Sequence, residues 1–531
     1  MSSMGLGNLS LLATVIAASV TYYWVLRRLT RANVQPDRTK RPDTSPNVRT
    51  TFRVSGVPID WGPEQLRSFL SSKTSTTDVV VESLAHEAGV DLQTATVSLG
   101  TIPLQLQSGR TWQIQLPQEL EGQVCGEQCL AIETDFHGIT TLYAPPPEDH
   151  RIDIVALSGL GHHAFGAFTD RKGTHMWLRD SLPWHLTSET SGKPMARVMI
   201  YGYESAIAGS KNMQNIEDLA TTFHSSLYSL AADPTKRRII LIGHSFGGLI
   251  IKQTLISLSR SKNPDDVKIL RAVCGVIFIG TPHDGMDISS LVPMVRDGAN
   301  RSLIESISRL NSQVLSIQQR DFHRALGDEG DLEVFCFYET VESPRAQQDE
   351  DGKWTMTGPP AAFLVTKSSA TYCRPWNDGP EYSCAIARSH SDLVRFGPHD
   401  ADYRTMKERI KGIARRALEA QRTLQAAAPK VPAAVNIGLD KNGDSTEEDV
   451  ANASLVHNST QYKCHGERNT TDGLVQAANT RAREVDEKHV NTLAYLNNRE
   501  LAFVDEGRWK EAENLWSQLA EKRKQILPRG E

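Results

Sequence analysis

Short apolar runs alternate with stretches of helical periodicity through the middle of the chain. The runs are rich in Val, Ile and Leu almost throughout, and they lie at residues 152–157, 198–203, 239–242 and 273–279. Strands that are apolar on both faces and separated by helices are typical of a parallel sheet with helices on both sides. We therefore predict one α/β domain over residues 150–422, with a mostly parallel sheet.

Two further apolar patterns fall inside this domain. Apolar residues at the 4,3,4,3 spacing of one helix face predict a single amphipathic helix over residues 303–326, which either caps the site or packs on the sheet. These residues are Leu303, Ile307, Leu310, Val314 and Ile317. The apolar run at 362–366 predicts a late strand of the sheet.

A smaller unit precedes the α/β domain, and the Ala-Pro-Pro-Pro sequence at 144–147 predicts a stiff break between the two. Residues 51–143 carry predicted strands and one predicted helix in the order strand, helix, strand, strand. The strands lie at 52–57, 79–84 and 94–99, and the helix lies at 63–70. This order indicates a ferredoxin-like α+β module.

The ferredoxin-like module resembles an RNA-recognition motif. Such motifs stack bases on aromatic side chains of two central strands, and the corresponding positions here are Arg53, Thr94 and Thr96. A platform without aromatic rings cannot stack bases. We therefore expect this module to pack on the α/β domain or to contact another protein rather than to bind RNA.

The N-terminal residues predict a membrane anchor. No charged side chain occurs before residue 27, and residues 6–26 are long enough for a helix to cross a hydrocarbon core of ~30 Å. The linker at 27–50 is basic, so the positive-inside rule places the bulk of the protein in the cytosol. We expect a single-pass membrane protein of the endoplasmic reticulum or the mitochondrion, and a mitochondrial targeting segment is the alternative.

The C-terminal part of the chain divides into a linker and a helical hairpin. Residues 423–485 are rich in Ala, Pro, Asn and Thr and have little apolar periodicity, which predicts a disordered linker. Residues 486–531 read as a helix, a turn at Gly507 and a second helix, and they resemble one tetratricopeptide-like repeat. A single repeat has no neighbours to bury its faces, so we expect a truncated array or a hairpin that docks on a protein partner.

The overall composition narrows the function only slightly. The 58 basic and 63 acidic residues give a formal net charge of -5, which is no general signature of nucleic-acid binding. The seven cysteines form neither an even disulfide framework nor a recognisable zinc motif. We therefore expect reduced thiols, no metal and no organic cofactor.

The motif Gly-His-Ser-Phe-Gly occupies residues 243–247, between a predicted strand and a predicted helix. In this setting Gly-x-Ser-x-Gly is a nucleophile elbow, so Ser245 is the candidate nucleophile. Gly243 and Gly247 leave room for a turn that is too tight for flanking side chains. The alternative is an ordinary strand-to-helix turn in which the serine caps the helix.

A serine nucleophile needs a base within hydrogen-bond reach and an acid that orients the base. In α/β-hydrolases the acid and then the base follow the serine along the chain. Glu339 ends the apolar strand at 334–339, and His390 follows the predicted late strand at 362–366. We therefore expect Ser245, Glu339 and His390 to form a catalytic triad.

Each partner of the serine has alternatives. Asp284 follows the strand at 273–279 and is the alternative acid, although it comes one strand earlier. Asp378 lies in a Trp-Asn-Asp-Gly sequence that is typical of a turn. His283 and His399 are the alternative bases, but neither follows the last predicted strand.

Acyl transfer through a tetrahedral intermediate also needs N–H donors for the oxyanion. One donor is expected from Phe246, the residue after the nucleophile. The other is expected from Leu160 in the glycine-containing turn that follows the strand at 152–157. A plain strand-ending glycine turn is the alternative for the second position.

Several separated motifs together resemble the serine-active-site-containing lipase-like proteins, relatives of the GPI inositol-deacylase lipases, in a form common in filamentous fungi. The motifs lie at residues 158–162, 176–180, 243–248, 337–339 and 389–392, and the resemblance covers roughly residues 150–415. It implies an α/β-hydrolase fold, membrane association and lipid or ester substrates such as those of phospholipid remodelling. One departure is Ser158, which stands where the family usually has the histidine of its His-Gly-Leu-Gly turn.

The sequence therefore predicts a membrane-anchored serine hydrolase that cleaves or transfers acyl esters, plausibly of phospholipid. Its partners would be the membrane and an acyl ester substrate. The alternative is an interaction scaffold with a hydrolase fold that is catalytically weak or inactive.

Overall fold

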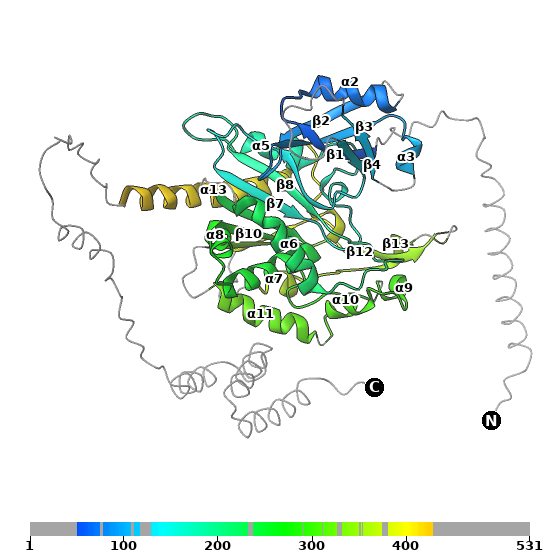
Figure 1. Ribbon diagram of the computed structural model, residues 1–531. Coiled ribbons are helices and arrows are strands. Elements are labelled where there is room, and N and C mark those ends of the chain that lie inside the picture. Colours follow the sequence, from blue (N-terminus) through cyan, green and yellow to red (C-terminus); the bar gives the residue numbers. More distant parts are fainter. Residues whose placement is uncertain are drawn as a thin grey trace, which may run out of the picture. The chain divides into compact units, whose positions relative to one another are not determined.

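The computed structural model in Figure 1 describes residues 50–74, 78–107, 111–116, 129–231, 237–289, 291–310, 312–326, 332–349, 352, 354–373 and 381–427. The predicted anchor at 6–26, the predicted hairpin at 486–531 and almost all of the predicted linkers at 27–50 and 423–485 lie outside these residues. Among the described helices, none combines the length and the apolar character that crossing a membrane requires.

A seven-stranded mixed sheet forms the centre of the α/β domain. Its order is β14-β11-β10-β9-β7-β8-β6, and the pairs are parallel except that the edge strand β6 runs antiparallel to β8. The strands are β6 (Gly138–Tyr143), β7 (Ile152–Leu157), β8 (Ala196–Gly202), β9 (Arg238–His244), β10 (Val273–Ile279), β11 (Glu333–Glu339) and β14 (Ser383–Ile386). The sheet is therefore parallel throughout except for one antiparallel strand at its edge, as in α/β-hydrolase sheets, which are mostly parallel.

Strand β6 corrects the predicted domain boundary. The sequence predicts that the small module extends to residue 143, but β6 pairs with β8 of the large sheet, with Thr141 opposite Met199. The prolines at 145–147 therefore lie in the β6–β7 connection, inside the α/β domain. A stiff proline segment marks an irregular connection, but it does not show whether the strands on its two sides share a sheet.

Helices cover both faces of the sheet (Figure 1). Alternate residues of β7 belong to two different buried clusters, because side chains of a strand point to opposite faces in turn. The first cluster includes side chains of α6 (Ile216–Ala231), α7 (Phe246–Arg260) and α11 (Gln313–Leu326). The second includes side chains of α4 (Trp177–Asp180), α5 (Leu182–His185) and α13 (Ala401–Ala427).

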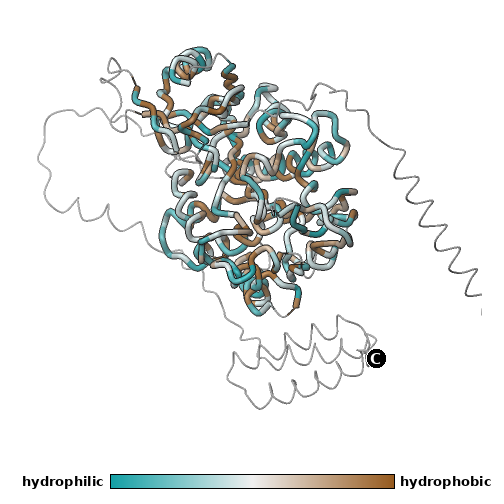
Figure 2. Tube along the Cα trace, turned by 90° about the vertical axis from the view of Figure 1, so that its right-hand side faces the viewer, coloured by the Kyte–Doolittle hydropathy of each residue, from teal (hydrophilic) through white to brown (hydrophobic). Residues whose placement is uncertain are grey.

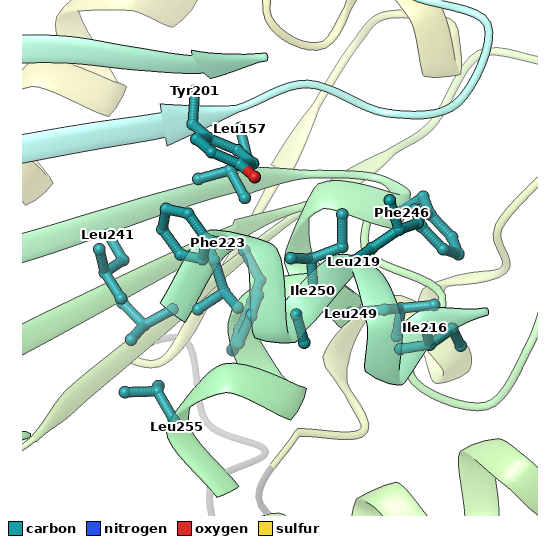
Figure 3. Close-up of a cluster of buried hydrophobic side chains, with 14 of the residues drawn as sticks. Leu157, Tyr201, Ile216, Leu219, Phe223, Leu241, Phe246, Leu249, Ile250 and Leu255 are labelled. Carbon is teal, nitrogen blue, oxygen red and sulfur yellow. The ribbon is translucent and has the colours of Figure 1, made fainter. Parts of the chain in front are cut away.

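The first cluster fixes α7, the helix that begins at the nucleophile elbow. Figure 3 shows side chains of α6 and α7 packed against those of the central strands. Apolar segments, brown in Figure 2, pass through the interior of the part of the chain that the structure describes.

Helix α13 ends at Ala427, so it continues beyond residue 422, where the sequence predicts that the α/β domain ends.

The predicted helix over 303–326 is two helices in the structure, α10 (Arg301–Ser306) and α11. Between them the chain runs beside Met286, whose N–H donates to the carbonyl oxygen of Ile307. Backbone groups that form these hydrogen bonds cannot also form those of a continuous helix. The apolar spacing of the side chains does not predict this break. Short elements complete this part of the fold: η2 (Gly166–Phe168), α8 (Pro264–Ala272), α9 (Val292–Val295), α12 (Lys367–Thr371) and η3 (His390–Asp392).

The predicted late strand at 362–366 is also placed differently. An antiparallel hairpin of β12 (Ser343–Gln348) and β13 (Trp354–Ala362) follows β11, and Figure 1 shows it at the edge of the domain. The run at 362–366 leaves this hairpin and leads into α12, where the Thr366 side chain accepts a hydrogen bond from the Ser369 N–H. The last strand of the sheet is β14, which has only four residues and is too short for its apolar pattern to predict a strand.

The N-terminal module has its own five-stranded antiparallel sheet in the order β2-β3-β1-β5-β4. Its elements are β1 (Thr50–Pro58), α2 (Pro63–Thr74), β2 (Val79–His86), β3 (Leu92–Leu99), α3 (Leu104–Gln107), β4 (Trp112–Gln115) and β5 (Cys129–Glu133). The predicted order of strand, helix, strand and strand is present. The four-residue α3 stands where a ferredoxin-like module has its second helix.

The polar face of this small sheet contacts the α/β domain. Arg53 donates hydrogen bonds to the His137 carbonyl at 2.6 Å and to the Thr140 hydroxyl of β6 at 3.0 Å. Thr96 is fully buried and accepts a hydrogen bond from Arg179 of α4 at 3.3 Å. The positions at which an RNA-recognition motif would stack bases are therefore occupied by contacts within the protein.

Candidate active site

Ser245 lies between β9 and α7 in a strained backbone conformation. Its φ of 53° and ψ of -125° are unusual for a residue with a side chain, and such a conformation costs about 1–3 kcal/mol. Its N–H donates to the Ile279 carbonyl at 2.8 Å, which ties the turn to β10. A Cβ atom on Gly243 would lie 2.5 Å from Gly248 Cα, and one on Gly247 would lie 2.6 Å from a backbone oxygen. The two glycines therefore permit the turn, as a nucleophile elbow requires.

A continuous hydrogen-bond chain joins Ser245, His390 and Glu339. The distance from Ser245 Oγ to His390 Nε2 is 2.8 Å, and that from His390 Nδ1 to Glu339 Oε2 is 2.5 Å. All three side chains are buried. With the Nδ1–H donating to the carboxylate, Nε2 carries the lone pair that accepts the serine proton. The structure thus brings the three predicted residues together in the order that nucleophilic catalysis needs.

The Glu339 carboxylate is held by two backbone groups that the sequence gave no reason to single out. Its Oε1 accepts hydrogen bonds from the N–H groups of Leu364 and Val365, at 2.8 and 3.1 Å. The second carboxylate oxygen is thereby left for His390. These two donors lie in the apolar run at 362–366, so the run supports the acid instead of forming a strand of the sheet.

The backbone of His390 is also held on both sides. Its N–H donates to Ser343 Oγ at 2.9 Å, and its carbonyl accepts a hydrogen bond from His244 Nε2 at 3.0 Å. Burial lowers the pKa of His244 well below its usual value, so this ring is neutral. The sequence gives no reason to expect Ser343 in the active site. For His244 the one sign in the sequence is its position beside Ser245 in the motif.

The alternative acid Asp284 takes no part in this hydrogen-bond chain. His390 Nδ1 is bonded to Glu339, whereas the N–H of Asp284 is bonded to Ser369 on α12. Asp284 is exposed, although partial desolvation raises the pKa of its carboxyl group. Asp378 lies outside the described residues.

The alternative bases lie elsewhere as well. His283 is buried edge-on against Phe278, with ring centroids 4.7 Å apart. His399 lines a separate groove of about 580 Å³. Neither ring makes the hydrogen bond to Ser245, which comes from His390.

The predicted oxyanion turn passes directly beside the nucleophile. A Cβ atom on Gly159 would lie 2.7 Å from Ser245 Cβ and 3.2 Å from its Oγ. In the described residues the Leu160 N–H has no backbone acceptor, and the Phe246 N–H is the first of α7, where a helix supplies no acceptor. His162 Nδ1 bonds the Leu160 carbonyl at 2.9 Å, and burial lowers the pKa of His162 to about 4. Two backbone donors thus border the space next to Ser245.

An open groove of about 710 Å³ begins at this turn. Its lining is part polar and part apolar, and it includes Gly161 and His162 of the turn, Tyr203 and Ile207 from the segment after β8, Met294 of α9 and Trp354 of β13. The groove therefore offers a mixed surface beside the turn, although Ser245 and His390 are not among the residues that line it.

The sheet order, the strained serine and the hydrogen-bonded Ser-His-Glu set place this domain in the class of α/β-hydrolase folds. No protein-family model matches the chain. The chain is 28% identical to protein SERAC1 of Bos taurus over 152 residues, which cover 28% of this chain and 23% of that protein. It is 27% identical to protein SERAC1 of Homo sapiens over 203 residues, which cover 36% of this chain and 30% of that protein. The matches thus span less than a third of the length of these relatives.

Several solved structures are similar to the chain. The mature form of lipase BlEst2 from Bacillus licheniformis has 15% identity and a TM-score of 0.29, over 48% of this chain and 89% of that chain. Lipase 1 from Pelosinus fermentans has 12% identity and a TM-score of 0.29, over 50% of this chain and 98% of that chain.

Proposed function

We propose that this protein is a serine hydrolase that cleaves or transfers acyl esters. The single observation that carries the proposal is the buried hydrogen-bond chain from the Glu339 carboxylate through His390 to Ser245 Oγ, which ends at a strained elbow. A serine hydroxyl is a weak nucleophile unless a base takes its proton, and this arrangement supplies that base.

The reaction follows from the geometry. His390 Nε2 takes the proton of Ser245 as Oγ attacks the ester carbonyl carbon, and the Leu160 and Phe246 N–H groups stabilise the oxyanion. Collapse of the intermediate breaks the ester C–O bond, and His390 gives its proton to the leaving alcohol. A water or a second alcohol then attacks the acyl-serine by the same route. The Glu339 carboxylate orients the imidazole and stabilises the imidazolium that forms.

The substrate class in this proposal is an acyl ester of a membrane lipid, with phospholipid as the candidate. Support comes from the mixed lining of the groove beside the oxyanion turn, and from the predicted anchor and basic linker. Basic residues near an anionic membrane contribute on the order of 1 kcal/mol each to its binding. The proposal places the domain on the cytosolic side of the endoplasmic reticulum or mitochondrial membrane. A reporter fused after residue 50 would test this: protease protection in sealed vesicles contradicts the cytosolic placement.

A fluorophosphonate probe tests the enzymatic proposal. Such probes phosphonylate activated serines, so the full chain in detergent should be labelled and Ser245→Ala should not. Ser257→Ala is the matched control, because Ser257 lies on the same helix α7 and its hydroxyl donates to the Gln253 carbonyl at 3.0 Å. Equal labelling of Ser245→Ala and the unmodified chain would contradict the proposal.

Ser158 favours one second candidate, a hydrolase-fold scaffold with little or no turnover. This residue replaces the histidine that the resembling family usually has in the oxyanion turn. Its backbone is nevertheless fixed, since the Ser158 carbonyl accepts the Tyr203 hydroxyl at 2.9 Å. A chain that folds normally, is not labelled and hydrolyses no ester would support the scaffold.

A further inference from the structure

A buried cluster of one histidine and two cysteines lies next to the strand that carries Glu339. His283 follows β10, Cys336 lies in β11, and Cys373 follows α12. One ring nitrogen and the two Sγ atoms all lie within 4.8 Å of one another. The three side chains are at most 5% exposed, and none belongs to the hydrogen-bond chain of the candidate active site.

His283 distinguishes this cluster from an ordinary apolar core. Both of its ring nitrogens are buried, and within the described residues neither has a hydrogen-bond partner. Buried polar groups nearly always have a partner, and an imidazole held edge-on against Phe278 cannot turn outward to find water. The two sulfur atoms lie 3.1 Å apart, and neither cysteine is in a disulfide. An unsatisfied nitrogen donor therefore faces two thiols in one enclosed place.

We propose that His283, Cys336 and Cys373 bind one zinc ion. Zn²⁺ takes thiolate sulfur and imidazole nitrogen, and sites with three protein ligands leave the fourth position to a small molecule such as water. Two thiolates and Zn²⁺ together have no net charge, which suits a buried site. Tetrahedral geometry with Zn–S bonds of about 2.3 Å puts two sulfurs roughly 3.8 Å apart, so the thiols would separate by less than an ångström.

A buried lysine lies beside the cluster. The Lys252 amine acts electrostatically on both cysteines and donates a hydrogen bond to Gln319 Oε1 at 2.6 Å.

The place of the cluster gives the ion a structural task. Cys336 lies in the strand that ends at Glu339. Cys373 follows α12, in the same stretch of chain as Leu364 and Val365, whose N–H groups hold the Glu339 carboxylate. A zinc ion would tie these two pieces of chain together and to the turn after β10. It would support the position of the acid without touching the substrate.

Metal analysis of the full chain tests the proposal directly. The chain, purified in detergent and reconstituted with Zn²⁺ under reducing conditions, should retain about one zinc after dialysis. Cys336→Ser and His283→Gln should each lose it. Cys274→Ser is the matched control, because Cys274 is an equally buried thiol in β10 outside the cluster, and it should retain the zinc. Substitution by Co²⁺ should give a thiolate-to-cobalt absorption band that the cluster variants lack.

Three results would overturn the proposal. The first is a folded chain that retains no zinc after reconstitution. The second is a disulfide between Cys336 and Cys373 in a peptide map of the purified chain, since that bond would consume both sulfur ligands. The third is a loss of zinc in Cys274→Ser as large as that in the cluster variants. If Cys336→Ser does not fold, His283→Gln, which retains both thiols, decides the same question. Because zinc content and cobalt absorption do not depend on turnover, they stay informative even if Ser245 proves inactive.

Discussion

Replacing Glu339 with glutamine tests the assignment of the acid, because the structure dictates how the new side chain must lie. The Leu364 and Val365 N–H groups need an acceptor, so they hold the amide oxygen where Oε1 now lies. The amide NH₂ group is then directed at His390 Nδ1. An NH₂ group cannot accept a hydrogen bond, so Nδ1 must become the acceptor and the ring proton moves to Nε2.

The consequence of Glu339→Gln is a histidine in the wrong tautomer. With a proton on Nε2, His390 cannot take the proton of Ser245, and the imidazolium that forms in the transition state loses its carboxylate. The change of tautomer and charge in related triads costs up to about 10⁴-fold in kcat. We expect a loss of roughly 10³ to 10⁴-fold in kcat, or about 4–5.5 kcal/mol in activation free energy, with little change in stability.

The assay is hydrolysis of a short p-nitrophenyl ester by the full chain, with circular dichroism to confirm the fold. Asp284→Asn is the matched control, and we expect its kcat to stay within roughly threefold of the unmodified value. A larger loss in Asp284→Asn than in Glu339→Gln would refute the reasoning and would make Asp284 the acid.

Three further predictions follow from single contacts. Gly159→Ala should abolish ester hydrolysis in a steady-state assay, since its Cβ would lie 2.7 Å from Ser245 Cβ; normal turnover would contradict the packing. Ser343→Ala removes the acceptor of the His390 N–H. We expect kcat to fall roughly fivefold, which corresponds to about 1 kcal/mol in activation free energy, with KM unchanged. A change in KM alone would contradict this role of Ser343. Burial lowers the pKa of His244, so its contribution to stability is present above the unfolded-state pKa of about 6.5 and is lost as the pH falls. In urea titrations, His244→Gln should therefore flatten the acid-side loss of unfolding free energy by up to about 1.4 kcal/mol per pH unit, and an unchanged slope would contradict this.

The parts of the fold that were predictable are those in which the signal is local. Continuous apolar runs identified β7, β9 and β10, because a strand buried on both faces has no polar positions to obscure it. The elbow at Ser245 was recognisable because so tight a turn leaves no room for side chains at Gly243 and Gly247. Chain order then pointed to Glu339 and His390, which the structure brings into contact.

The features that were not predictable depend on contacts between distant segments. The apolar spacing from Leu303 to Ile317 is helical, yet Met286 interrupts it by pairing with the chain in between. The residues of strand β6 do not show which of the two sheets the strand joins. The prolines after it therefore led to the wrong boundary between the N-terminal module and the α/β domain. Leu364 and Val365 hold the Glu339 carboxylate with their backbone N–H groups. Every residue except proline has such a group, so the sequence does not show which residues donate in this way.

The proposed mechanism requires Ser245 to become covalently acylated during turnover. The most direct measurement is mass spectrometry of the full chain, quenched with acid during hydrolysis of a p-nitrophenyl ester and then digested. The account predicts an acyl adduct on the peptide that contains Ser245, and no hydrolysis by Ser245→Ala. An adduct on another residue, or undiminished hydrolysis by Ser245→Ala, would contradict it.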